Sequence, residues 1–151
     1  MPVGLMGSHM VQTNKPNWNE DWEAFVRSVG QSFDHGLDDR AVTRLYSGRP
    51  AIWTGKVTRL RLDGDRPGVQ LEMPLIEFDF SDGRRGRVDY LFLHLVPEDV
   101  QSWKQVVVGA AVRFQTSING AEGIFPGIRW CDFDDNRGTV MFGTTGGILL
   151  P

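Results

Sequence analysis

The stretch from Arg87 to Ile118 constrains the fold most, because it predicts a strand, a short helix and a second strand in succession. Arg87–Val96 is rich in Val, Tyr, Phe and Leu, which is typical of a buried strand. Pro97 suits the first position of a helix, whose apolar face is expected to reach Val107. Ala111–Ile118 then alternates apolar and polar side chains, as a half-buried strand does.

Two strand-like runs precede this unit and one follows it. We expect strands over Ala51–Leu62, Val69–Phe80 and Ile124–Phe133, separated by segments rich in Gly, Asp and Pro. The apolar phase slips in the first of these strands near residues 55–59, and in the second beside Pro74. Small barrels need such bends in order to close, so the sequence predicts a mainly β fold.

Both ends of the chain lie outside this pattern. Residues 1–10 resemble the remnant of an expression tag and are set aside. Residues 11–50 predict an N-terminal helical extension, with one helix starting near Asn17 and a second over Leu37–Tyr46. Residues 134–151 predict an additional C-terminal strand or arm, which would cover the barrel, pair with a strand edge or reach a partner.

The order strand, strand, strand, helix, strand, strand over residues 51–133 resembles the OB fold. That fold is a five-stranded Greek-key barrel, here with its helix between strands 3 and 4. The run Val108–Phe114 is similar to the helix-to-strand entry of such domains. The resemblance implies a ligand face on the second and third strands, flanked by the loops Asp63–Gly68 and Asn119–Gly123.

The third expected strand is apolar on both sides. One side consists of leucines, and the other is a row that contains three aromatic rings: Val88, Tyr90, Phe92, His94 and Val96. If the leucines face the core, Tyr90, Phe92 and His94 face outward, where aromatic rings can stack with nucleic-acid bases. The alternative is that the N-terminal helices cover this side and both sides belong to the core.

Arginines lie close to this row in the sequence. The turn before the third strand contributes Arg84, Arg85 and Arg87, and the first strand with its following turn contributes Arg59, Arg61 and Arg66. A flexible cationic turn can follow a phosphate backbone, whereas the alternative is an ordinary solvated hairpin turn. Residues 51–130 contain equal numbers of basic and acidic residues, and the whole chain has a net charge of −3. Binding of an anionic polymer would therefore require the charges to be segregated in space.

The sequence offers little for catalysis, metals or cofactors. Cys131 is the only cysteine, so neither an internal disulfide nor a cysteine-based zinc site can form. Asp132–Gly138 has the alternating acids of a calcium loop, but Arg137 stands where that loop needs glycine, so no metal is expected. A Cys131–His94 pair is conceivable, yet no nucleophile elbow, phosphate-binding loop or dinucleotide motif is present. We therefore expect neither an enzyme nor a cofactor.

These observations favour a non-enzymatic binding module for single-stranded nucleic acid. Its expected contacts are Arg59, Arg61, Arg84, Arg85 and Arg87 for phosphates and Tyr90, Phe92 and His94 for bases. The alternative is a protein-interaction or assembly module, which would bind a protein partner or a second copy of the chain. Because no apolar run reaches the length of a membrane span and no signal peptide is visible, we expect a cytoplasmic protein without a membrane partner.

Overall fold

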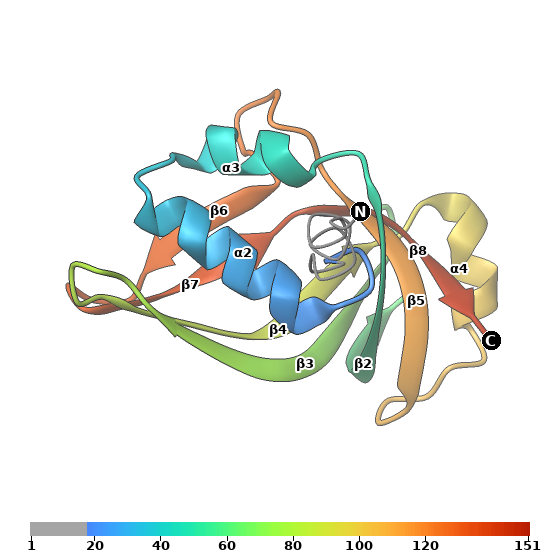
Figure 1. The fold of residues 1–151 in the computed structure, drawn as a ribbon. Coiled ribbons are helices and arrows are strands. Elements are labelled where there is room, and N and C mark those ends of the chain that lie inside the picture. Colours follow the sequence, from blue (N-terminus) through green and yellow to red (C-terminus); the bar gives the residue numbers. More distant parts are fainter. Residues whose placement is uncertain (1–17) are drawn as a thin grey trace, which may run out of the picture.

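A computed structural model describes residues 18–151, which form three helices and seven strands (Figure 1). The predicted tag remnant and residues 11–17, with the expected helix start at Asn17, lie outside the described residues. The helices are α2 (Trp22–Asp34), α3 (Asp39–Tyr46) and α4 (Pro97–Trp103). The strands are β2 (Pro50–Arg61), β3 (Gly68–Asp79), β4 (Arg85–His94), β5 (Ala111–Ile118), β6 (Ile128–Asp132), β7 (Arg137–Phe142) and β8 (Thr144–Leu150).

All the described strands belong to one sheet in the order β6-β7-β4-β3-β2-β5-β8. β2 pairs antiparallel with β3 and β5, while β4 pairs antiparallel with β3 and parallel with β7. β8 is the last strand of this order and β7 is the second from the other end, yet only Gly143 separates them in the chain. The sheet must therefore curl until its ends meet (Figure 1), which confirms the predicted mainly β, barrel-like architecture.

Threonine hydroxyls join β7 and β8 to β4 where the sheet closes. The Thr144 hydroxyl donates to the Phe92 carbonyl oxygen at 2.8 Å and accepts from the His94 backbone N–H at 3.1 Å. The Thr139 hydroxyl donates to the Arg87 carbonyl oxygen at 2.6 Å. Thr144 is 1 % exposed, so its hydroxyl replaces water at these two peptide groups. Side chains thus extend the closure beyond the short backbone ladder between β4 and β7.

Irregular pairing bends the sheet at the two places that the sequence indicates. The β2–β3 register shifts between Val57 and Arg59, and the β3–β4 register shifts between Glu72 and Ile76, around Pro74. Both predicted bends are therefore confirmed. Each bend increases the local twist, which allows the sheet to curl.

β4 also changes phase, and the sequence pattern did not reveal this change. Val88 is buried together with Leu91 and Leu93, whereas Tyr90 and Phe92 are only partly buried. The expectation that Val88 shares the outward side with Tyr90 is therefore wrong. The physical reason is the β3–β4 irregularity, where more residues of β3 than of β4 span the same distance and the side chains are re-aimed.

The core lies between the inner face of the sheet and α2, which crosses that face (Figure 1). Trp22 and Phe25 of α2 contact Trp53 of β2 and Phe142 of β7, with ring centroids 4.8 to 5.9 Å apart. These four large side chains are all buried. The N-terminal helices therefore fill the inside of the curl and leave the outer face of β3 and β4 uncovered.

The side chains of each helix also form hydrogen bonds with backbone groups of a strand, along an edge where no other strand pairs with it. α2 bonds to the part of β3 that extends beyond its pairing with β2, α3 bonds to β6, and α4 bonds to β8. In α2, Trp22 and Arg27 donate to the carbonyl oxygens of Pro74 and Glu77. In α3, Thr43 and Asp39 accept from the N–H groups of Ile128 and Trp130. In α4, Asp99 accepts from the Gly147 N–H and Trp103 donates to the Gly147 carbonyl oxygen. Backbone groups that could pair with a foreign strand are thus occupied.

Two helix boundaries differ from the sequence-based expectation. α2 begins at Trp22 because Asp21 is its N-cap, with a carboxylate that accepts from the Ala24 N–H at 3.0 Å. α4 ends at Trp103, so Val107 does not lie on its face and is 68 % exposed. The run of three β-branched residues from Val106 disfavours a longer helix.

The C-terminal third of the sheet differs most from the expectation. The expected strand Ile124–Phe133 is reduced to β6, which pairs with β7 alone among the described strands. The strand begins after Pro126, which lacks a donor for a ladder hydrogen bond. Residues 134–151, expected to be an additional strand or arm, contribute the two strands β7 and β8, and their pairing with β4 and β5 agrees with the alternative in which this segment pairs with a strand edge.

Candidate functional site

A groove of about 500 Å³ crosses the outer face of β4. Tyr90, Phe92 and His94 of β4 line it, and Phe125 and Arg129 line it from the side of β6. We call this cavity the aromatic groove. Tyr90 and Phe92 are partly buried and His94 is exposed, so their rings are accessible to a ligand. None of the N-terminal residues that the structure describes (18–50) lines the groove, so the alternative of helices covering this face is wrong.

Phe92 is fixed by a glycine on the neighbouring strand. A Cβ atom at Gly68 would lie 2.5 Å from Cζ of Phe92, so the ring lies directly against the glycine backbone. The His94 ring meets the Phe92 ring edge-on, with centroids 4.8 Å apart. The two rings therefore have defined positions before any ligand binds, which lowers the entropic cost of binding.

Two titratable groups of the aromatic groove are held in their neutral forms. Partial burial lowers the pKa of His94 below its ordinary value of 6.5, opposed by a hydrogen bond of the imidazole with the backbone of Thr144. Burial also raises the pKa of Tyr90 above 10.0. Near neutral pH the groove therefore presents an uncharged imidazole and an uncharged phenol, both suited to stacking.

A second, smaller cavity of about 210 Å³ adjoins the aromatic groove. Arg59 and Arg61 of β2 and Arg66 of the following turn line it, and it shares Phe92 and His94 with the groove. We call this cavity the arginine pocket. Within residues 18–151 these three arginines form no ion pair or hydrogen bond through their side chains. Because no ion pair within these residues neutralises them, the three like charges repel one another, which favours an anion beside them.

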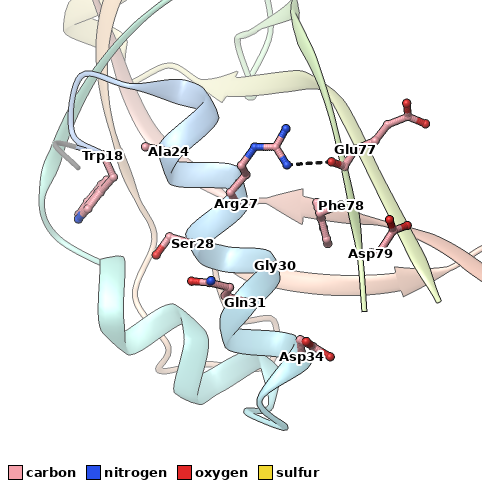
Figure 2. A pocket seen from close by; sticks show the side chains of 10 residues that line it. All are labelled: Trp18, Ala24, Arg27, Ser28, Gly30, Gln31, Asp34, Glu77, Phe78 and Asp79. Atoms are coloured by element: carbon pink, nitrogen blue, oxygen red, sulfur yellow. Dashed lines mark hydrogen bonds between the residues drawn. The ribbon is translucent and has the colours of Figure 1, made fainter. Parts of the chain in front are cut away.

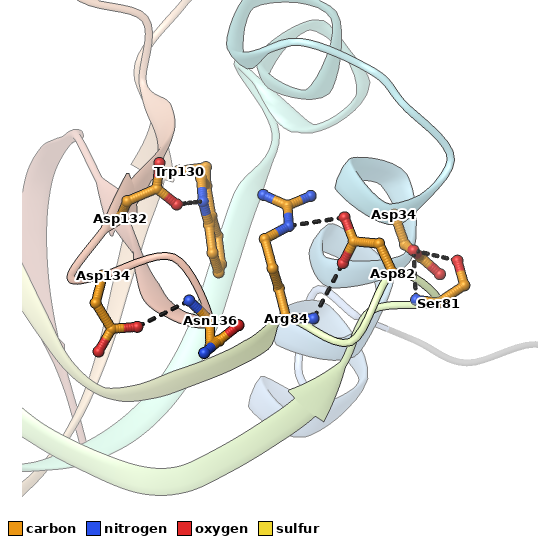
Figure 3. Close-up of polar contacts among 8 residues, drawn as sticks. All are labelled: Asp34, Ser81, Asp82, Arg84, Trp130, Asp132, Asp134 and Asn136. Carbon is orange, nitrogen blue, oxygen red and sulfur yellow. Dashed lines mark hydrogen bonds and ion pairs between the residues drawn. The ribbon is translucent and has the colours of Figure 1, made fainter.

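The arginines of the β3–β4 turn are placed differently. Arg84 donates to Asp82 at 2.9 Å (Figure 3). Its guanidinium also lies over the rings of Phe80 and Trp130, 4.5 and 5.6 Å from their centroids. The backbone N–H of Arg84 is the main reason that the pKa of Asp82 is lowered. An exposed ion pair of this kind contributes little to stability, but the carboxylate beside the arginine repels a phosphate.

Arg85 and Arg87 also have acidic partners. Arg85 donates to Asp79 at 3.0 Å, which raises the arginine pKa, and Arg87 lies 3.6 Å from Asp89. Neither residue lines the aromatic groove or the arginine pocket. The structure thus brings Arg59 and Arg61 together with Tyr90, Phe92 and His94, and separates Arg84, Arg85 and Arg87 from them.

Phe125 and Arg129 are groove residues that the sequence analysis missed. The Arg129 guanidinium lies over the Phe125 ring, 5.2 Å from its centroid. Phe125 is 72 % exposed, in a loop whose backbone carbonyls at Ala121 and Gly123 accept hydrogen bonds from Arg40 of α3. The apolar Ile124-Phe125 pair between glycine and proline is the available signal, but the sequence pattern predicts a strand there.

A larger cavity of about 670 Å³ follows the exposed side of α2 (Figure 2). Arg27 points across it and donates to the Glu77 carbonyl oxygen at 3.0 Å. Asp34 accepts from the Ser81 hydroxyl and backbone N–H, and these bonds lower its pKa. Arg27 and Asp34 therefore hold α2 against β3 and the turn that follows it, which is a structural role.

The described residues show no arrangement for metal binding. Within residues 18–151 no three His, Cys, Asp or Glu side chains are placed to hold an ion. The Asp134 carboxylate instead accepts from the Asn136 N–H (Figure 3) and from Arg137, and these bonds lower its pKa. The acidic segment is thus a turn stabilised by its own backbone. No helix in the described part of the chain is both long and apolar enough to cross a membrane.

Comparison with known proteins adds no relative. The chain matches no protein-family model, no curated protein and no solved structure. The functional interpretation therefore depends on the geometry of the aromatic groove and the arginine pocket.

Proposed function

We propose that the protein is a non-enzymatic module that binds single-stranded nucleic acid in the aromatic groove and the arginine pocket. One observation carries the proposal: accessible aromatic rings and three arginines without acidic partners share one continuous surface. Phe92 and His94 belong to both cavities, so a single ligand can contact rings and arginines together. A single strand is such a ligand, because its unpaired bases and its phosphates alternate along the chain.

The aromatic residues provide the stacking contribution. Every base has a flat π face, so stacking on Tyr90, Phe92 or Phe125 tolerates all sequences and contributes about 1–3 kcal/mol per base. Arg129 can add a cation–π contact or reach a phosphate. The proposed contact set therefore keeps Tyr90, Phe92 and His94, and adds Phe125 and Arg129.

The arginine pocket provides the electrostatic contribution. The net charge of −3 gives no general attraction for an anionic polymer, so attraction must be local. Arg59, Arg61 and Arg66 supply it, since none has an acidic partner among residues 18–151. In this proposal Arg84, Arg85 and Arg87 are secondary contacts, because each must first leave a carboxylate.

The strand order supports a variant of the OB barrel as the scaffold of this proposal. β2, β3 and β4 are followed by a helix and β5, and the proposed ligand surface lies on β3 and β4, the face that OB domains use. Four strands in the order β4-β3-β2-β5 need one further strand that pairs with both ends. β7 pairs with β4 and β8 pairs with β5, so residues 137–150 would be that strand, and β6 would be an addition.

Fluorescence polarisation with a labelled single strand at several salt concentrations tests the proposal. We expect binding that weakens with salt, and in Arg59→Ala/Arg61→Ala a salt slope smaller by about 0.7 for each lost phosphate contact. Arg84→Ala/Arg85→Ala is the matched control and should change the slope less. Phe92→Leu keeps an apolar side chain against Gly68 but removes the flat ring, and should weaken binding by about 1–3 kcal/mol. Absence of binding at low salt would remove nucleic acid as the ligand.

A protein partner is the second candidate, and one observation favours it. Ile124 and Phe125 are 84 % and 72 % exposed side by side at the rim of the aromatic groove. Exposed apolar pairs of this kind often anchor protein interfaces. Ile124→Ser separates the candidates, because Ile124 does not line the groove. This variant should leave nucleic-acid binding unchanged, whereas a protein interface would lose affinity from either Ile124→Ser or Phe125→Ser.

A further inference from the structure

The surroundings of the arginine pocket favour a bound strand that ends in the pocket over one that continues past it. The turn that carries Arg66 also exposes Asp63 and Asp65. Carboxylates in this turn repel a phosphate backbone that would run on over it. On the other side, the shared Phe92 and His94 connect the pocket with the aromatic groove. A strand lying in the groove would therefore end at the arginines.

The number of arginines also exceeds what one internal phosphate requires. A phosphodiester carries one negative charge, whereas a terminal phosphate monoester carries about 1.5–2 negative charges at pH 7 and offers three acceptor oxygens. Arg59, Arg61 and Arg66 all line the pocket, and a guanidinium group can bind such oxygens in pairs. Their mutual repulsion is offset best by the ligand with the larger charge.

We infer that the arginine pocket binds the terminal phosphate of a single-stranded nucleic acid, with the base next to that phosphate stacked on Phe92. This inference rests on the proposed function, because it identifies which part of the strand occupies the pocket. It adds a selection of strand ends that an ordinary sequence-tolerant binding surface lacks. It also gives the bound strand a direction, since the two ends of a strand are not equivalent.

A competition experiment with the full chain tests the inference. A labelled oligothymidylate of about ten nucleotides is displaced by unlabelled strands that are identical except for a 5′-phosphate, a 3′-phosphate or hydroxyl groups at both ends. We expect one of the two phosphorylated strands to compete at a roughly tenfold lower concentration than the hydroxyl strand. Arg61→Ala and Arg66→Gln should each reduce this advantage, while Arg84→Ala should preserve it. Circular dichroism of each variant checks that the fold is kept.

The possible outcomes separate this inference from the proposed function. If phosphorylated and hydroxyl strands compete equally, the inference is overturned, although binding itself stands. An advantage for both phosphorylated ends that persists in Arg61→Ala would be a general charge effect and would also overturn it. If the labelled strand does not bind at all, the proposed function and the inference both fail.

Discussion

Thr144→Val should destabilise the protein strongly, although it changes the size of the side chain very little. Valine has nearly the shape of threonine, but it cannot donate to the Phe92 carbonyl oxygen or accept from the His94 N–H. Both peptide groups then remain in a region where Thr144 is 1 % exposed. An unsatisfied buried polar group costs about 1–3 kcal/mol, so the two together should lower the free energy of unfolding by about 2–4 kcal/mol. For a domain of this size that corresponds to a decrease in Tm of roughly 5–15 °C.

Differential scanning calorimetry or urea unfolding measures this loss, with two controls. Thr144→Ser keeps the hydroxyl and should retain most of the lost stability. Thr145→Val changes the exposed neighbouring threonine of β8 and should cost less than the buried substitution. If Thr144→Val unfolds within about 0.5 kcal/mol of the unmodified chain, side-chain closure of the barrel is refuted. The same conclusion follows if serine is no better than valine.

Two further predictions concern the ligand surface. Gly68→Ala would place a Cβ atom 2.5 Å from Phe92 Cζ and 3.0 Å from the Leu93 carbonyl oxygen. It should cost about 1–3 kcal/mol of stability by overpacking and weaken the binding of a nucleic-acid strand by displacing the Phe92 ring. Unfolding and binding titrations that both give unchanged values would contradict this. Because the pKa of His94 is lowered in the folded protein, the unfolded chain takes up a proton first, and stability should decrease as the pH falls below 6.5. This pH range lies well above the one in which Asp34, Asp82 and Asp134 titrate, because the pKa of each of these aspartates is lowered. His94→Gln should remove this part of the pH dependence, and an unaltered unfolding profile between neutral and mildly acidic pH would argue against it.

The local signals in the sequence predicted the elements well. Alternation identified β5 correctly, and the phase slips identified the bends in β2 and β3, because burial of one sheet face is encoded at the level of neighbouring residues. The outward placement of Tyr90, Phe92 and His94 followed from the same logic. What failed in β4 was the assignment of Val88, since a bulge depends on how two strands pair and not on either strand alone.

Long-range pairing was out of reach for the same reason. The sequence of the weakly apolar tail 134–151 does not indicate that this tail joins β4 to β5. The closure of the sheet depends there on hydroxyl groups and glycines, which are also ordinary in loops. The arginines show the limit most clearly. Arg84 and Arg61 look alike in sequence, but one lies beside Asp82 and the other lines a pocket without an acidic partner among the described residues. Spatial segregation of charge is a property of the fold, whereas composition gives only the total number of charges.

The helices that bond to the strand edges have a consequence for how the protein would aggregate. Cross-β stacking needs a row of free backbone donors and acceptors, and side chains from α2, α3 and α4 occupy such groups on β3, β6 and β8. Detachment of a single helix would uncover such a row while most of the sheet stays intact. The hazardous species is then a nearly native molecule, so fibril formation would be governed by the stability of helix docking and would begin below the temperature at which the whole domain melts.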